Sequence, residues 1–533
     1  MKKIHYEKND ILINSDENIL FEELQEMSRE QFEEWIVRLR KKIVEIWDEY
    51  NYPPRTGKTE ADIIDQFNKM ESYPVHTFEH TDELSDVEND VVINKSRVGV
   101  EVDQWFPTMY KTRINYTAGD TGYSIYDLFS DDKHLNRMIK GGWRHFKKDS
   151  MYKHALTCIK NDKKYSIIDT DSGREWVEQF FLHQNDIFQN RDFVLDRLQI
   201  NSKSTSYFQI QESSILALTA NEVRELIDNN TLSFRHYSFI DADNLSDEYI
   251  YTIRMYEKGH RIFPRCYAAF RIGYIQPAVN FPPLTAKYLY ERYTEHLVGK
   301  QDPIVIYDPS SGWGGRILGA MSVKDNRKIH YIGTDPNTDL FYEEEDGTIV
   351  SRHENLANFY NSKTYRGNPF FSSQNTYKVF CKGSEELQHE PEFQRFRGEV
   401  DLIFTSPPYF NREAYSEDET QSYKKYGSSY ESWRDGFLYP TLKTCYEWLK
   451  NDRYLLWNIA DVKIGSEYLP LEADSIHILE SFGMKYLYTL KMALENMPGK
   501  NRIGEDGLPT CKNFCKVNGR FLKYEPVLVF KKG

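Results

Sequence analysis

Cysteine is scarce in this chain of 533 residues, which contains six cysteines at irregular spacing. So few cysteines do not form a disulfide framework, and their scarcity predicts a protein of a reducing compartment. Only Cys511 and Cys515 lie close together, and no second pair or nearby histidine accompanies them. A structural zinc site needs four such ligands, so we expect no metal.

Long apolar runs are also missing. The mean hydropathy is −0.68, and no run approaches the roughly 18–20 residues that cross a bilayer. The first ten residues, MKKIHYEKND, carry lysines but no apolar segment behind them, unlike a secretory signal. We therefore expect a cytoplasmic protein that does not bind membranes.

The chain as a whole has no excess of positive charge, since its formal net charge is −14. Residues 1–100 alone hold 13 basic and 23 acidic side chains, which account for −10 of this charge. Because the acidity is local, the net charge does not exclude a nucleic acid as partner.

A basic stretch with interspersed aromatic residues occupies residues 131–164, where ten Lys and Arg face four Asp. Basic side chains neutralise phosphates and aromatic rings stack on bases, so this stretch is the best candidate for nucleic-acid contact. An ordinary solvated helix face with a few core aromatics is an equally good interpretation of the stretch alone. The candidate contact residues are Lys140, Arg144, Lys147 and Lys148.

The first 280 residues predict a helical start and then a mixed region. Residues 20–50 lack Gly and Pro and place apolar side chains at helical spacing, which predicts an amphipathic helix or helical pair that ends at 51–54. The acidic residues 82–90 are expected to form a solvated loop. We assign residues 1–99 to an acidic helical region and 100–280 to a mixed α/β or α-rich region.

After residue 280, short apolar runs alternate with helical stretches, as in a parallel sheet with crossover helices. This rhythm predicts an α/β fold, with one doubly wound domain over residues 281–533. The expected strands are 303–307, 329–333, 376–381, 400–405, 453–459, 484–490 and 525–531.

Two of these strands end in candidate ligand-binding residues. The first is followed by Asp308-Pro-Ser-Ser-Gly312-Trp-Gly314-Gly315, a turn whose backbone approaches a ligand without obstruction by Cβ atoms. The second ends at Asp335, twenty residues beyond Gly315. A carboxylate at this distance suits the vicinal hydroxyls of a ribose.

The most specific motif is Thr405-Ser-Pro-Pro-Tyr409, again at the end of an apolar strand. Consecutive prolines remove two N–H donors and leave carbonyl groups that can point into a pocket. Ser406 adds a hydroxyl acceptor and Tyr409 adds a flat face for stacking. This set suits an exocyclic amino group on a flat heterocycle, held for in-line attack on an electrophilic methyl group.

Residues 281–533 resemble the catalytic domain of S-adenosylmethionine-dependent amino-methyltransferases that act on DNA. The segment DPSSGWGG is similar to the cofactor loop of that family, TSPPY to its catalytic motif, and YEPVLVFKK to its last strand. The resemblance implies a Rossmann-like, doubly wound sheet of seven strands. It also implies a cofactor site that includes Phe281, Asp308, Ser310, Gly312, Gly314, Asp335 and Ser384, and a catalytic set of Ser406, Pro407, Pro408 and Tyr409.

One departure from the family concerns the third strand, after which the family often has an Asp near the cofactor adenine. This chain has Lys382-Gly-Ser384-Glu385 there, so the contact would fall to Ser384.

The resemblance implies double-stranded DNA as partner, with the target base flipped out of the stack. A serine before the two prolines favours N4 of cytosine, and N6 of adenine is the alternative. An RNA amino-methyltransferase, and a catalytically silent DNA-binding protein with the same fold, are further alternatives. We expect residues 100–280 to recognise the DNA and the polar loop 410–429 to close over the flipped base. Both a monomer and a homodimer fit the sequence.

Overall fold

The computed structural model describes most of the C-terminal half of the chain and a smaller part of the N-terminal half. The described residues are 15–54, 60–85, 90–93, 96, 98–114, 122–146, 207–211, 232–233, 250–254, 261, 278–300, 303–323, 327–344, 346–363, 375–416, 418–427, 429–464, 467–494 and 508–533.

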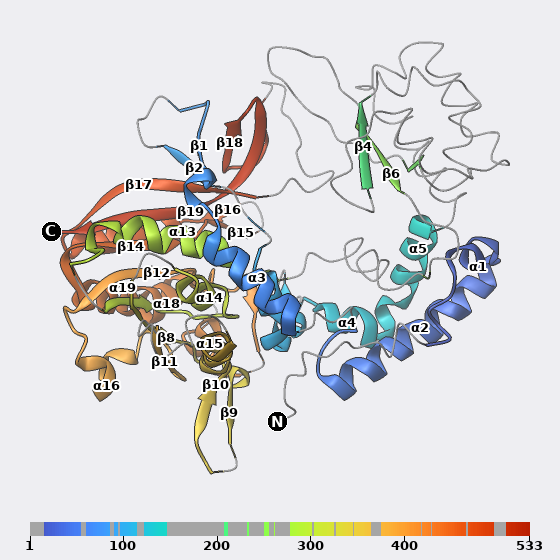
Figure 1. Ribbon diagram of the computed structural model, residues 1–533, viewed down its shortest axis with the longest axis horizontal. Coiled ribbons are helices and arrows are strands. Elements are labelled where there is room, and N and C mark those ends of the chain that lie inside the picture. The colour runs from blue at the N-terminus through green and yellow to red at the C-terminus, as the bar shows by residue number, and fades with distance from the viewer. Residues whose placement is uncertain are drawn as a thin grey trace.

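One large sheet dominates the structure (Figure 1). Seven of its strands occur in the order β11-β8-β7-β12-β14-β19-β17, with β11 at one edge of the sheet. Their bounds are β11 (Thr376–Phe380), β8 (Ile329–Thr334), β7 (Ile304–Asp308), β12 (Val400–Thr405), β14 (Leu449–Asn458), β19 (Arg520–Lys532) and β17 (Met484–Ala493). The strands from β11 to β14 run parallel, and β19 is antiparallel to both β14 and β17. All seven expected strands are confirmed, as is the Rossmann-like α/β fold.

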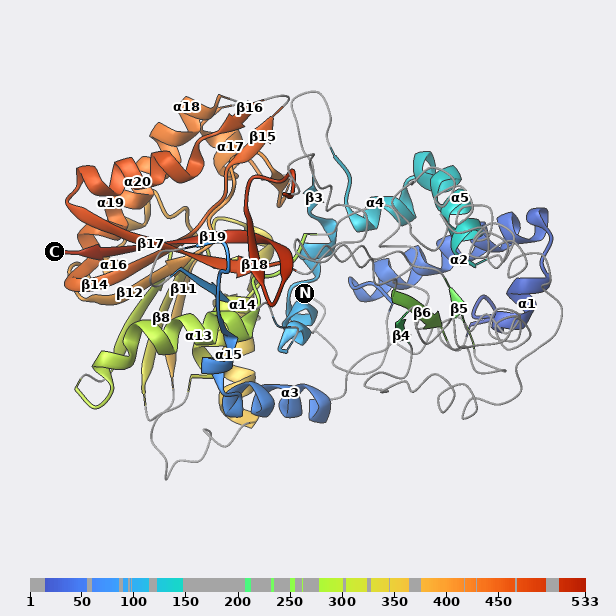
Figure 2. The ribbon, with the colours of Figure 1, turned by 90° about the horizontal axis from the view of Figure 1, so that it is seen from above.

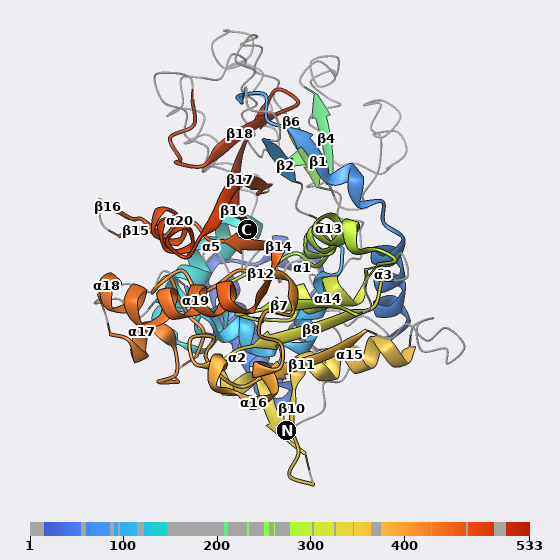
Figure 3. The same cartoon turned by 90° about the vertical axis from the view of Figure 1, so that its left-hand side faces the viewer.

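Alternate residues of the buried strands pack on opposite faces of this sheet, as the two-residue period of a strand requires. In β7, Ile304 and Ile306 belong to one apolar core, whereas Val305 and Tyr307 belong to the other. Figure 3 shows the helices in two layers, one on each face of the sheet. One layer contains α13 (Pro283–Thr294), α14 (Gly315–Met321) and α15 (Arg352–Lys363), and the other contains α16 (Pro391–Gln394), α18 (Tyr430–Trp433), α19 (Tyr439–Trp448) and α20 (Leu471–Ser481).

The direction of strand order reverses between β7 and β12. From β7 the chain passes to β8 and then β11 on one side, and it returns to β12 on the other side. In open α/β sheets, the connections that follow two such neighbouring strands lead to opposite sides and leave a crevice at the carboxyl ends of the strands. The turns after β7 and β12 both border this crevice, and they carry the two main motifs.

The N-terminal region contributes strands to the same sheet. The hairpin of β1 (Glu79–Thr81) and β2 (Val91–Ile93) extends the sheet, because β2 pairs in parallel with β17. The expectation of a solvated acidic loop at 82–90 is wrong for Asp82, which is buried and paired with Lys491. A strand residue distant in sequence neutralises this carboxylate and makes its burial tolerable.

The expected helical pair is confirmed as α1 (Phe21–Glu26) and α2 (Arg29–Tyr50). Ser28 caps α2 by accepting a hydrogen bond from the backbone N–H of Gln31, and Asn51 ends the helix in the left-handed conformation. The inner face of α2 packs against α4 (Ile125–Ser130) and α5 (Leu135–Phe146). Figures 1 and 2 show these four helices together, to one side of the sheet.

A further N-terminal helix, α3 (Glu60–Ser72), packs on the sheet domain itself. The ring of Phe67 stacks on that of Tyr360 in α15 at 4.5 Å. The buried ammonium of Lys287 in α13 donates to the carbonyls of Met70 and Glu71 at 2.8 and 2.9 Å. A cation at the carboxyl end of a helix is favourable, so this contact fastens α3 to α13.

Candidate active site

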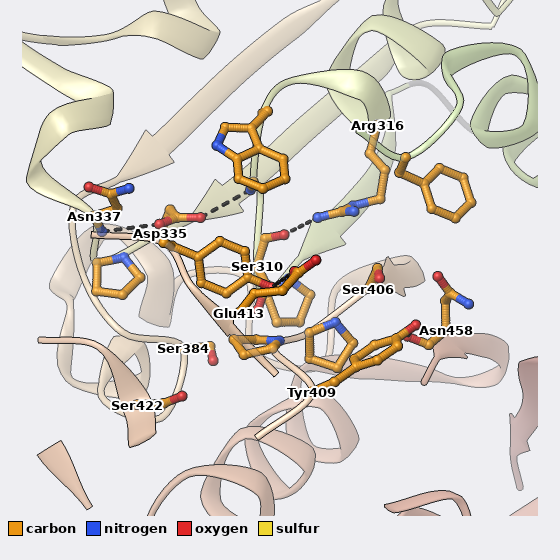
Figure 4. Close-up of a pocket in the computed structure, with 18 of the residues that line it drawn as sticks. Ser310, Arg316, Asp335, Asn337, Ser384, Ser406, Tyr409, Glu413, Ser422 and Asn458 are labelled. Atoms are coloured by element: carbon orange, nitrogen blue, oxygen red, sulfur yellow. Dashed lines mark hydrogen bonds between the residues drawn. The ribbon is translucent and has the colours of Figure 1, made fainter. Parts of the chain in front are cut away.

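A pocket of about 200 Å³ opens at the carboxyl ends of the central strands (Figure 4). It is several times the volume that one water molecule occupies in the liquid, and thus has room for an organic ligand. Its walls come from the turns after β7, β8, β11 and β12, from the ends of β14 and β17, and from the middle of β19. The pocket therefore lies in the crevice where the strand order reverses.

The glycine-rich turn after β7 forms one wall. Gly312 lies in the left-handed region with a φ of 57°, and a Cβ there would have no atom nearer than 3.6 Å. At Gly315, in contrast, a Cβ would lie 2.1 Å from the carbonyl oxygen of Phe281. Gly314, a predicted cofactor residue, is not among the residues that line the pocket. A Cβ on it would meet the ring of Phe106 at 2.3 Å.

Asp308 lies behind this turn and does not line the pocket. The carboxylate is fully buried, with Nε of Arg316 at 2.7 Å and the hydroxyls of Tyr331 and Thr405 at 2.6 and 2.7 Å. The backbone N–H of Ser310 also donates to it, at 3.3 Å. Asp308 therefore joins β7, β8, β12 and α14 and fixes the turn, while Ser310 lines the pocket.

Asp335 reaches the pocket from the end of β8. Its two oxygens accept the backbone N–H groups of Gly312 and Asn337, both at 3.0 Å (Figure 4). Burial raises the pKa of Asp335 to about 6, although the two N–H donors oppose this shift. Each oxygen keeps a further lone pair for a hydroxyl donor of a ligand.

Two more predicted cofactor residues, Phe281 and Ser384, also line the pocket. Phe281 precedes α13, and its ring contacts Phe404 of β12 with centroids 5.1 Å apart. The hydroxyl of Ser384 is 2.9 Å from that of Thr441, so part of its hydrogen-bonding capacity is used inside the protein.

The four predicted catalytic residues, Ser406 to Tyr409, line the pocket together on the turn after β12. The hydroxyl of Tyr409 donates to Oε1 of Glu525 at 2.6 Å and to the carbonyl oxygen of Asn458 at 3.1 Å. Burial raises the pKa of this phenol well above its ordinary value, and the Glu525 carboxylate raises it further. Tyr409 is therefore a neutral donor at physiological pH.

Residues 410–429, expected to form a polar loop that closes over the flipped base, include a short strand and buried side chains among the described residues. Phe410 is buried, and β13 (Glu413–Ala414) pairs with β3 (Arg113–Ile114) of the N-terminal region. Glu413 lines the pocket and accepts a hydrogen bond from the hydroxyl of Tyr415 at 2.6 Å. Burial raises the pKa of this carboxyl group. Because β13 pairs with a strand that is distant in sequence, the polar composition of residues 410–429 did not predict their packing.

The predicted DNA contacts are placed in part. Lys140 is exposed on α5, and Arg144 belongs to the same helix. Lys147 and Lys148 lie outside the described residues, as does most of the region 100–280. Lys140 therefore lies at the surface. Contact of this stretch with DNA stays a prediction.

Sequence reasoning missed several residues that build the site. Asn280 donates to the carbonyl of Trp313 at 2.5 Å and accepts from the N–H of Gly315 at 3.2 Å, so it clamps the glycine-rich turn. Asn458, Met492 and Glu525 also line the pocket. They come from three C-terminal strands whose apolar patterns predict the strands but not the side chains that face a pocket.

Metal-binding clusters and membrane spans are both absent from the part of the chain that the structure describes. In that part, no group of three or more His, Cys, Asp and Glu is placed to hold a metal ion. No described helix is long and apolar enough to span a membrane.

Comparison with known proteins gives one sequence relative and several solved structures. The Type II beta methyltransferase M.BslI of Bacillus sp. (strain NEB-606) is 27% identical over 175 residues, which are 31% of this chain and 17% of that protein. A putative DNA modification methylase of Thermus thermophilus is 21% identical over 28% of this chain and 50% of its own, with a TM-score of 0.19. TrmN of Thermus thermophilus is 13% identical over 54% of this chain and 57% of its own, with a TM-score of 0.25.

A family model gives the more specific match. Residues 400–533 match the N6/N4 methyltransferase family, described as DNA methylase. This range begins at β12 and contains both the Ser406–Tyr409 turn and the last strand, β19. The resemblance inferred from the motifs is therefore confirmed: the segment that carries the Ser406–Tyr409 turn is similar to the DNA methylases of the N6/N4 family.

Proposed function

We propose that this protein is an S-adenosylmethionine-dependent DNA methyltransferase that modifies the exocyclic amino group of a flipped base. The observation that carries the proposal is the meeting of three predicted elements at one pocket: the glycine-rich turn, Asp335 and the Ser406–Tyr409 turn. The family match over residues 400–533 supports DNA as the substrate. The chain spans 17% of the length of its sequence relative, so the match to that relative concerns a part of it.

The residues at the β7–β8 side fit the cofactor. The space beside Gly312, which a Cβ would occupy, admits a ligand close to the backbone, and Asp335 offers acceptors to ribose hydroxyls. Phe281, Ser310 and Ser384 complete this side of the pocket. When bound, S-adenosylmethionine supplies an electrophilic methyl group.

The residues at the β12 side fit a flat base with an amino group. Among the described residues, no backbone N–H donates to the carbonyls of Ser406 or Pro407. Such carbonyls, with the Ser406 hydroxyl, can accept the two N–H bonds of an amine and draw its lone pair out of ring conjugation. Tyr409 offers a ring face for stacking, with its hydroxyl already satisfied by the protein.

We further propose N4 of cytosine as the position modified, since serine occupies position 406. N6 of adenine is the alternative product on the same geometry. One experiment separates them: the protein is incubated with tritiated cofactor and double-stranded DNA of mixed sequence, and the DNA is digested to nucleosides. We expect label in N4-methylcytosine. Label in N6-methyladenine would correct the base, and label in RNA alone, in a parallel reaction, would overturn DNA as the substrate.

We propose that Lys140 and the basic stretch around it hold the phosphates of the duplex. Lys140 is exposed on α5, which supports contact with a polyanion. Lys140→Glu is expected to weaken DNA binding and to lower the salt dependence of the binding constant. The matched control is Lys41→Glu, the same charge change on the exposed side of α2. Equal DNA affinity of the two variants would argue against this surface.

A further inference from the structure

The hydroxyl of Tyr409 is held by two acceptors that lie far away in sequence. Oε1 of Glu525 is 2.6 Å from it and the carbonyl oxygen of Asn458 is 3.1 Å from it. Figure 4 shows Tyr409 directed towards Asn458. A carboxylate acceptor makes the first of these a charge-assisted hydrogen bond, which is stronger than one between neutral groups.

Both acceptors belong to rigid elements. Asn458 ends β14 and Glu525 lies in β19, which pairs with β14 on one side and with β17 on the other. The side-chain amide of Asn458 also donates to the carbonyl of Pro526 at 2.9 Å, which fastens the end of β14 to β19 beside Glu525. The C-terminal strands therefore supply two acceptors for the Tyr409 hydroxyl, and the Ser406 side chain, on the same turn as Tyr409, also hydrogen-bonds to it.

A tyrosine on a turn has free rotation about two side-chain bonds unless its ends are fixed. The prolines at 407 and 408 restrict the backbone before Tyr409, and the two acceptors fix the far end of the ring. Together they fix the axis from Cβ to the hydroxyl oxygen, and because a phenolic O–H lies preferentially in the ring plane, the direction of the bond to Glu525 favours one plane of the ring. A base that stacks on a fixed ring is oriented before it reacts, and orientation of this kind contributes to the rate.

We propose that Glu525 is a positioning residue for the transfer step, which it serves by holding the Tyr409 hydroxyl and thereby the ring on which the target base stacks. This inference rests on the proposed function and extends it to a residue outside the catalytic motif. It makes a carboxylate of the last strand part of the machinery, although this carboxylate acts through Tyr409.

The test is a double-mutant cycle on Tyr409→Phe and Glu525→Ala, with Glu525→Gln as the conservative variant. Tyr409→Phe keeps the ring and removes the donor, whereas Glu525→Ala removes the main acceptor. We expect each to lower kcat by about 10-fold or more, on the scale of a hydrogen bond to a charged group, with little change in KM for DNA. Because both remove the same bond, the double variant is expected to be no slower than the slower single variant.

Glu525→Gln separates positioning from proton transfer. The amide oxygen of glutamine still accepts the phenol proton, so positioning predicts a kcat within a few-fold of the unmodified protein. A loss as large as that of Glu525→Ala would overturn the positioning role in favour of a charge that takes up a proton. Fully multiplicative losses in the cycle would overturn the coupling itself. Glu480→Ala, on the exposed side of α20, is the control for loss of a carboxylate elsewhere.

A second readout does not depend on methyl transfer. The thermal midpoints of the same four proteins of the cycle are expected to be non-additive, because the bond is present without DNA. Additive midpoints would show that the Tyr409–Glu525 bond is absent in solution, and would overturn the inference even if the protein methylates DNA. Coupled midpoints without any methyl transfer would instead reject the proposed function and leave the contact intact.

Discussion

The two sides of the pocket are built on different principles. On the β7–β8 side, the carboxylates of Asp308 and Asp335 are held by donors of the protein itself, and these bonds shape the turn. On the β12 side, prolines leave carbonyls without backbone N–H partners among the described residues, and the Tyr409 hydroxyl is held by Glu525 and Asn458. On the first side, hydrogen bonds within the protein already hold the turn in place. On the second side, carbonyl acceptors are left without backbone N–H donors in the part of the chain that the structure describes.

This difference separates the effects expected from mutation. Under the proposed function, changes on the β7–β8 side are expected to alter folding and cofactor affinity, because the carboxylates there support the backbone. Under the proposed function, changes on the β12 side are expected to alter the transfer step while the cofactor still binds. A β12-side variant that weakens cofactor binding, or a β7–β8-side variant that lowers kcat at saturating cofactor, would show that the two sides are not independent.

The largest effect is expected for Asp308→Ala. It leaves the guanidinium of Arg316 buried and without its partner carboxylate, and breaking a buried ion pair costs about 3–5 kcal/mol. The free energy of unfolding, measured by denaturant titration, should fall by about this amount. Asp435→Ala is the control, because Asp435 pairs with Arg434 in an exposed position and such pairs contribute about 0–1 kcal/mol. Equal stability of the two variants would contradict the supporting role of Asp308.

The next effect is expected for Asp335→Ala, which removes the proposed acceptor for the ribose hydroxyls. Loss of a charged acceptor costs about 1.5–3 kcal/mol, or about 10- to 150-fold in the dissociation constant of S-adenosylmethionine. Calorimetric titration measures this constant, and kcat at saturating cofactor should change little. A normal cofactor affinity combined with a low kcat would reverse the assignment of the two sides.

A smaller effect is expected for Tyr409→Ala. Loss of one base–aromatic stack costs about 1–3 kcal/mol, and the variant also lacks the hydroxyl, so kcat/KM for DNA should fall by about 10- to 100-fold, at least as much as for Tyr409→Phe. Cofactor affinity should stay within a factor of about two, since Tyr409 stands on the other side of the pocket. Full activity of the variant would remove Tyr409 from the site.

The strands and the main motifs of this site were predictable from sequence because they are local. A buried parallel strand is a short apolar run, and the residues just after it lie at the carboxyl edge whatever the rest of the chain does. Asp335 and Ser406 were found in this way, and both line the pocket.

The side chains that support the motifs were not predictable. Glu525 lies 116 residues from Tyr409, and nothing in the pattern of an apolar strand indicates that one of its acids faces a pocket. Asp308 was predicted to contact the cofactor, yet its carboxylate points to Arg316 behind the turn. Sequence places a carboxylate after a strand, but only the packing decides which way it faces.

The smallest effect concerns pH and again distinguishes the two sides. The pKa of Asp335 is about 6 because of burial, so a ligand that donates hydroxyls to it binds the ionised form. At pH 5 about one tenth of this carboxyl is ionised, and cofactor affinity should be about tenfold weaker than at pH 8. The raised pKa has the opposite effect on the free energy of unfolding of the free protein, which falls as pH rises between about 4 and 6. The reason is that the unfolded chain already loses this proton near the ordinary pKa of 3.8, whereas the folded protein still holds it. Asp335→Asn should flatten the affinity profile over this range, whereas Tyr409→Phe should leave it unchanged. An unchanged profile in Asp335→Asn would assign the titration to another group.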